Sequence, residues 1–157
     1  MIHNINSYIF PAAFGLLPGS MDTPASRAML LAIGLQESRF EHRRQMGGGP
    51  AQGFWQFEKA GVQGVIEHPS TRAFAIQVCQ ELIYTPSVIV VATSIANNDV
   101  LACAFARLLL WTVDGMLPSR GFPERGWRQY IDGWRPGKPH RLTWNDNFAL
   151  AWTIVEP

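Results

Sequence analysis

The sequence predicts a mainly helical protein with a single domain. Apolar residues recur at helical spacing over residues 24–39, 99–113 and 124–134, and the glycine-rich segment over residues 41–52 carries no strong strand signal. Proline and glycine clusters separate the helical segments, with no internal repeat and no linker. At 157 residues the chain has the length of one domain built around one core, so we expect residues 1–157 to fold together.

The first expected helix spans residues 24–39. Thr23 is a favourable N-cap residue for this helix, and Pro24 is favourable in its first turn. Apolar residues follow at helical spacing. Glu37 then falls in the last turn, just before a glycine-rich loop. Partial burial and the negative end of the helix dipole both disfavour an ionised carboxylate, so we expect a raised pKa for Glu37. The structural alternative is that Glu37 is simply the first polar residue after a core helix.

The rest of the chain predicts one loop and six further helices. Residues 41–52 are expected to form a loop or a small irregular hairpin. Further helices are expected over residues 54–66, 71–83, 86–96, 99–113, 124–134 and 143–155. Gln56 would lie in the early turn of the first of these, and Asn98 or Asp99 would cap the helix that begins at residue 99. Trp127, Tyr130 and Trp134 form a stripe that is more typical of a core than of a cleft.

Composition and charge disfavour several classes of protein. The net charge is +1 and the basic residues are scattered, so no nucleic-acid partner is expected. Residues 88–96 are apolar but too short to cross a bilayer, and residues 1–6 lack the basic start of a secretory signal. The histidines show no metal-ligand spacing, and no Lys-Ser or Lys-Thr follows the triple glycine, so no metal, phosphate loop or other cofactor is predicted. Cys79 and Cys103 are expected to be a reduced pair in the core, with a disulfide as the alternative outside the cytoplasm.

Two short motifs give the chain a family resemblance. Glu37-Ser38, followed by Gly-Phe-Trp-Gln-Phe over residues 53–57, resembles the Glu-Ser and Gly-Leu-Met-Gln-Ile motifs of the lysozyme-like lytic transglycosylases and goose-type lysozymes. The 19 residues from Glu37 to Gln56 are close to the spacing in that family. The resemblance implies a lysozyme-like helical domain with a small irregular loop or β subdomain beside the cleft. It is diagnostic over residues 24–60 and loose beyond them.

The resemblance also implies an activity and a set of site residues. Glu37 would be the catalytic acid and base of a muramidase that cuts the β-1,4 bond between N-acetylmuramic acid and N-acetylglucosamine in peptidoglycan. A lytic transglycosylase needs only this one glutamate, whereas an inverting lysozyme needs a second carboxylate, for which Glu41 and Glu58 are the nearest candidates. The expected substrate-binding residues are Ser38, Gly53, Trp55, Gln56, Phe105 and Tyr130. Tyr130 falls where the family places a late tyrosine near the glutamate.

The third family motif, Ala-Tyr-Asn, is altered in this chain. Its best counterpart is Ala104-Phe105-Ala106, which lacks both the tyrosine hydroxyl and the asparagine amide. The sequence therefore leaves three functions open: a lytic transglycosylase, a non-catalytic glycan-binding or phage structural protein of the same fold, or a small helical assembly protein in which Glu37 is structural. The enzyme is expected to originate from a phage or prophage, as an endolysin or virion component that reaches the cell wall after release. The sequence does not define an oligomeric state.

Overall fold

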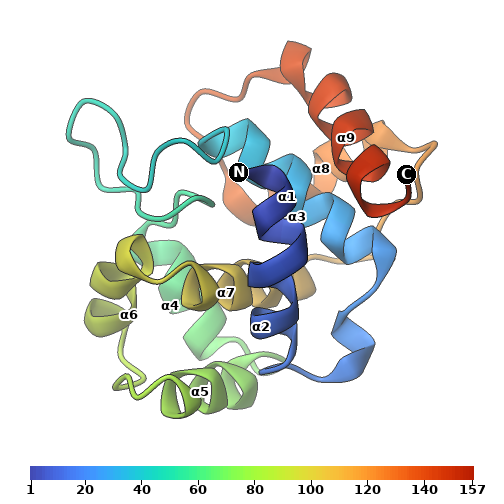
Figure 1. The fold of residues 1–157 in the computed structure, drawn as a ribbon. Coiled ribbons are helices and arrows are strands. Elements are labelled where there is room, and N and C mark those ends of the chain that lie inside the picture. The colour runs from blue at the N-terminus through green and yellow to red at the C-terminus, as the bar shows by residue number, and fades with distance from the viewer.

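Helices make up most of the chain, as predicted from the sequence. The computed structural model describes residues 1–157. Its elements are α1 (Ile2–Asn4), the π-helical η1 (Ile5–Ile9), α2 (Phe10–Phe14), η2 (Gly19–Met21), α3 (Pro24–Glu37), α4 (Lys59–Glu67), α5 (Arg72–Glu81), α6 (Val88–Ser94), η3 (Ile95–Asn97), α7 (Asp99–Trp111), α8 (Pro123–Trp134) and α9 (Arg141–Val155) (Figure 1). Strand pairing is limited to isolated bridges from Gln52 to Arg44 and to Phe57.

Helix α7 is the central element of the core. Residues 101–110 are all buried, and α7 packs against α2, α3, α4, α5 and α8 (Figure 1). A helix that is apolar on every side is stable only when other elements surround it. The Asn98 side chain caps α7 by accepting a hydrogen bond from the Leu101 backbone N–H at 3.0 Å, which confirms the predicted start of this helix.

Helix α3 carries Glu37 and lies along α9 for much of its length. Its start is fixed by a reciprocal cap, in which Thr23 Oγ1 accepts from the Ser26 N–H at 3.1 Å and Ser26 Oγ accepts from the Thr23 N–H at 2.9 Å. Pro24 occupies the first turn, where a missing N–H costs nothing. The helix begins where the sequence predicts and ends with Glu37.

One local prediction is corrected. The helix expected over residues 54–66 begins only at Lys59, because residues 53–57 form a tight turn in which Gln56 has a φ of +49°. Near the N-terminus, Pro11 and Gly15 lie at the two ends of α2. Pro11 lies in the first turn of α2 and Gly15 follows its last residue, which are positions that tolerate these residues.

Both cysteines are free and buried in the core. Burial raises the pKa of the Cys79 thiol to about 11, which keeps it protonated and unreactive at neutral pH. Their chemistry is therefore that of small apolar core residues. No helix in the structure combines the length and the apolar character that crossing a bilayer requires.

Candidate active site

The chain turns sharply directly after Glu37. Arg39 and Phe40 both have a φ of +56°, so α3 ends within one residue of the glutamate. Phe40 folds back and packs on α3 at Gly34, where a Cβ atom would overlap the Phe40 ring. The missing side chain at Gly34 therefore lets this buried phenylalanine close the end of the helix. The turn leaves Glu37 half-buried at the last position of α3.

Glu37 is hydrogen-bonded to Tyr130, which lies on α8. The Tyr130 hydroxyl donates to Glu37 Oε1 at 2.5 Å across 93 residues of sequence. Tyr130 is only 2% exposed, and its ring stacks on the Trp144 indole with centroids 5.3 Å apart and planes 5° from parallel. Packing thus fixes the ring, and the hydroxyl fixes one oxygen of the carboxyl group. The structure brings together the two residues that the sequence resemblance paired.

Burial raises the pKa of Glu37, and the negative charge of Glu58 adds a smaller effect in the same direction. The Tyr130 hydrogen bond opposes them, because it stabilises the ionised carboxylate, but it does not reverse the direction. The pKa of Tyr130 is also raised, chiefly by its own burial and then by the Glu37 charge, so its hydroxyl keeps its proton. Glu37 therefore keeps its proton to a higher pH than an ordinary glutamate does, which suits it to donate a proton.

Ser38 links the two sequence motifs instead of lining a surface. Its hydroxyl donates to the Phe54 carbonyl at 2.6 Å and accepts from the Phe40 N–H at 3.1 Å. The residue is buried, and these backbone groups occupy its hydroxyl. The predicted substrate-binding role of Ser38 is therefore corrected: it joins the end of α3 to the turn over residues 53–57.

Within that turn, Gly53 and Gln56 are held by backbone geometry. Gly53 has a φ of +76°, and a Cβ atom there would lie 2.6 Å from Ile95 Cγ2, so only glycine fits. Gln56 is half-exposed, and its Nε2 donates to the Gly53 carbonyl at 2.8 Å. Gly53 is buried and shapes the turn, whereas Gln56 keeps an exposed part that is able to contact a ligand.

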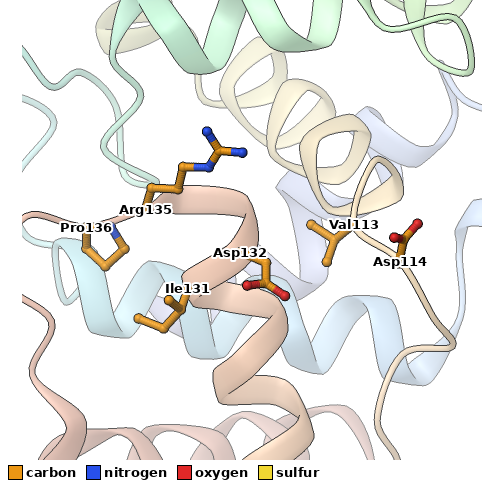
Figure 2. Close-up of a pocket in the computed structure, with 6 residues that line it drawn as sticks. All are labelled: Val113, Asp114, Ile131, Asp132, Arg135 and Pro136. Atoms are coloured by element: carbon orange, nitrogen blue, oxygen red, sulfur yellow. The ribbon is translucent and has the colours of Figure 1, made fainter.

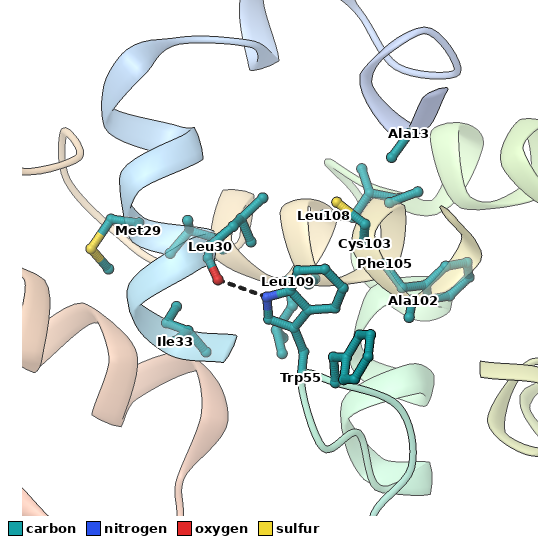
Figure 3. Close-up of a cluster of buried hydrophobic side chains, with 14 of the residues drawn as sticks. Ala13, Met29, Leu30, Ile33, Trp55, Ala102, Cys103, Phe105, Leu108 and Leu109 are labelled. Carbon is teal, nitrogen blue, oxygen red and sulfur yellow. Dashed lines mark hydrogen bonds between the residues drawn. The ribbon is translucent and has the colours of Figure 1, made fainter. Parts of the chain in front are cut away.

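Trp55 and Phe105 are core residues, which corrects their predicted contact with substrate. Both are 0% exposed (Figure 3). The Trp55 indole N–H donates to the Leu30 carbonyl on α3 at 2.8 Å, so neither its ring nor its polar atom is free for a sugar. Phe105 lies on α7, whose central position buries every side of the helix. The aromatic residue of the altered third motif thus packs in the interior.

The carboxylates considered as a second catalytic group occupy different environments. Glu41 is exposed and lies 3.8 Å from His42. Glu58 precedes α4, makes no capping hydrogen bond, and lies close enough to influence the Glu37 pKa. Of the two, Glu58 is the carboxylate whose charge reaches Glu37.

One contact that holds the site has no signature in the sequence. Gln36 Oε1 accepts hydrogen bonds from Asn147 Nδ2 at 2.9 Å and from Thr143 Oγ1 at 3.1 Å, and its Nε2 donates to the His140 carbonyl at 2.8 Å. These bonds attach the end of α3 to the start of α9, more than a hundred residues away. No short-range pattern signals such a long-range contact.

A hollow of about 550 Å³ lies between the ends of α7 and α8 (Figure 2). It is lined by Val113, Asp114, Ile131, Asp132, Arg135 and Pro136, and Glu37 is not among these residues.

No group of three or more histidine, cysteine, aspartate or glutamate side chains is arranged to hold a metal ion. Comparison with protein-family models, curated proteins and solved structures gave no match, so the family resemblance rests on the sequence motifs alone.

Proposed function

We propose that this protein is a peptidoglycan-cleaving muramidase with a lysozyme-like fold, acting as a lytic transglycosylase with Glu37 as its single acid and base. The observation that carries the proposal is the contact between Glu37 and Tyr130. A half-buried carboxyl group with a raised pKa, oriented by a fixed hydroxyl, is the group that acid-catalysed cleavage of a glycosidic bond requires.

The reaction has two steps in which Glu37 changes role. Protonated Glu37 gives its proton to the glycosidic oxygen as the bond from the muramyl C1 to that oxygen breaks, which releases the N-acetylglucosamine 4-hydroxyl. Ionised Glu37 then takes the proton of the muramyl 6-hydroxyl as its oxygen bonds to C1. The product is a 1,6-anhydro ring, no water is consumed, and Glu37 regains its proton. Tyr130 keeps the carboxyl oriented through both steps.

The nearby Glu58 charge favours one alternative within the same class. A hydrolase of the inverting type would use a second carboxylate to activate water on the opposite face of the sugar. Glu58 is the candidate, since its charge already acts on Glu37. Hydrolysis would leave a reducing end on the muramyl residue instead of an anhydro ring, so mass spectrometry of the released fragments separates the two reactions.

The altered third motif favours a second candidate function. Phe105 replaces a polar family residue and is wholly buried, as is Trp55, so fewer side chains than expected are available to hold a sugar. A non-catalytic glycan-binding or phage structural protein would tolerate these losses.

The test is the loss of turbidity of purified peptidoglycan with wild type and with Glu37→Gln. The glutamine keeps the shape of the side chain but has no acidic proton to transfer to the glycosidic oxygen. Lysis by the wild type and its loss in the variant support the enzyme. Equal activity of the two proteins rules out Glu37 as the catalytic group, and absence of activity in both, with retained binding to the glycan, favours the non-catalytic function.

A further inference from the structure

The hollow between α7 and α8 contains three charged groups without partners in the chain. Arg135 lies at one side, Asp114 at the other and Asp132 between them (Figure 2). All three side chains are exposed, and the salt bridges of the structure lie elsewhere. Val113 and Ile131 add apolar surface to the hollow. One cation and two anions are therefore available to a ligand that carries both kinds of charge.

The backbone at Arg135 is in an unfavourable conformation for an arginine. This residue ends α8 in the left-handed region, with φ +47° and ψ +53°. Glycine is the usual residue at such a position, because any Cβ atom raises its energy. Strain of this kind persists where the surrounding structure holds it, and it is concentrated at functional sites. The conformation places the guanidinium at the edge of the hollow (Figure 2).

The opposite wall, which carries Asp114, is held in place by buried contacts. Gly115 turns the chain with a φ of +90°. The Gln129 amide, only 4% exposed, donates from Nε2 to the Met116 carbonyl at 3.0 Å and keeps this turn against α8. Gly133 lets α8 approach the same segment closely, since a Cβ atom there would lie 3.0 Å from Val113 Cγ2. These contacts within the chain therefore form the hollow in the absence of a ligand.

We infer that this hollow binds a peptide that bears both ammonium and carboxylate groups, with its carboxylate on Arg135 and its ammonium on Asp114 and Asp132. Charge-assisted pairs of this kind are the stronger hydrogen bonds in proteins. The inference rests on the proposed function for its ligand: peptidoglycan carries short peptides with both groups on its muramyl residues. The glycan would be cut at Glu37 while the peptide occupies the hollow.

The hollow and the contact to Glu37 share helix α8. Tyr130, the partner of Glu37, and Arg135 are five residues apart, which is about 7.5 Å along the helix axis. At about 100° per residue, Ile131 and Asp132 lie about 100° and 160° around α8 from Tyr130, and Arg135 directly follows the end of the helix. Helix α8 therefore carries the contact to Glu37 on one side and the wall of the hollow largely on the opposite side.

The test uses the tripeptide L-alanyl-γ-D-glutamyl-meso-diaminopimelate as a soluble probe. It is titrated into the full chain, and the methyl resonances of Val113 and Ile131 are followed by NMR. The expected result is saturable shifts of these two methyl groups, with affinity about tenfold weaker or worse in Arg135→Gln, since a charge-assisted bond is lost. Arg72→Gln, which removes an exposed arginine on α5, is the matched control and should bind as the wild type does.

Arg135→Gly gives a second, independent readout. Glycine relieves the left-handed conformation, so this variant should unfold at a higher temperature than the wild type while losing the same affinity. Retained affinity in both Arg135 variants overturns the inference, as does the absence of saturable shifts at Val113 and Ile131 in the wild type. If Arg135→Gly loses affinity for the tripeptide and also unfolds at a higher temperature, misfolding is excluded as the cause of the lost affinity.

Comparison with glycan that has been stripped of its peptides separates this inference from the proposed function. If both hold, Arg135→Gln cuts stripped glycan as the wild type does but cuts peptide-bearing glycan less efficiently, through a higher KM. If the wild type cuts both substrates and the tripeptide does not bind, only the inference about the hollow fails. If the tripeptide binds but neither glycan is cut, the proposed enzymatic function fails, and the hollow remains a peptide site of unassigned origin.

Discussion

The Tyr130 hydroxyl lies 2.5 Å from Glu37 Oε1 and donates a hydrogen bond to it. The donor is fixed by burial and by stacking on Trp144, so the carboxyl group has one oxygen held and one oxygen left to react. The same bond stabilises the ionised form, whereas burial and the Glu58 charge stabilise the protonated form. These opposing effects make the pKa of Glu37 sensitive to single substitutions around it.

Tyr130→Phe is expected to raise the pKa of Glu37 further. The ring keeps its place against Trp144, but the hydrogen bond that favours the carboxylate is lost. Because the acid step needs protonated Glu37, activity falls as the pH rises through this pKa, and in the variant the fall should move to higher pH. The measurement is the pH profile of peptidoglycan lysis. Tyr8→Phe, at an exposed tyrosine in η1, is the control, and a Tyr130→Phe profile that moves to lower pH contradicts the assignment.

Glu58→Gln should move the same profile in the opposite direction. Removing the Glu58 charge takes away a repulsion that disfavours ionised Glu37, so the pKa of Glu37 falls and activity is lost at lower pH. A transglycosylase should otherwise keep its maximal rate in this variant. Loss of that rate by about a hundredfold or more would instead identify Glu58 as the base of a hydrolase. Glu81→Gln, at an exposed position on α5, controls for the change in net charge.

Glu37→Gln should leave the fold as stable as the wild type, or more stable, at neutral pH. The folded-state pKa of Glu37 is raised above its ordinary value of 4.5, so ionisation costs more in the folded chain than in the unfolded one. The wild type should therefore lose stability relative to the variant as the pH rises from about 4.5 through the raised pKa, and the difference should stay constant above it. Urea unfolding at several pH values measures this difference. A variant that is less stable at every pH would show that Glu37 is a structural partner.

The sequence predicted those features that depend on neighbouring residues. Thr23 and Pro24 define the start of α3, and Asn98 the start of α7, because capping is a local interaction. The pairing of Glu37 with Tyr130 was expected only from the family resemblance, since no local rule relates residues so far apart. The sequence correctly associates the aromatic stripe that contains Tyr130 with the core. The Tyr130 hydroxyl nevertheless reaches Glu37.

The errors have a common physical cause, which is burial imposed by tertiary packing. Trp55 and Phe105 have the chemistry of sugar-stacking residues, but the central position of α7 and the closeness of α3 place both in the interior. The sequence predicts that Gln56 lies in the first turn of a helix, whereas the positive φ values of Gly53 and Gln56 produce a turn in which Ser38 binds the Phe54 carbonyl. Side-chain type alone does not distinguish a core aromatic residue from one that lines a site.

Gly53→Ala should destabilise the fold and disturb the site together. The added Cβ atom would lie 2.6 Å from Ile95 Cγ2 in a backbone conformation with φ +76°, and the two effects should cost roughly 2–4 kcal/mol of unfolding free energy. Gly64→Ala is the matched control, because Gly64 is an exposed helical residue of α4 with open space around it, and alanine should stabilise it by about 0.5–1 kcal/mol. Thermal and urea unfolding of both variants measure these changes. Equal stability of the two variants would show that the turn over residues 53–57 does not need the left-handed glycine at its first position.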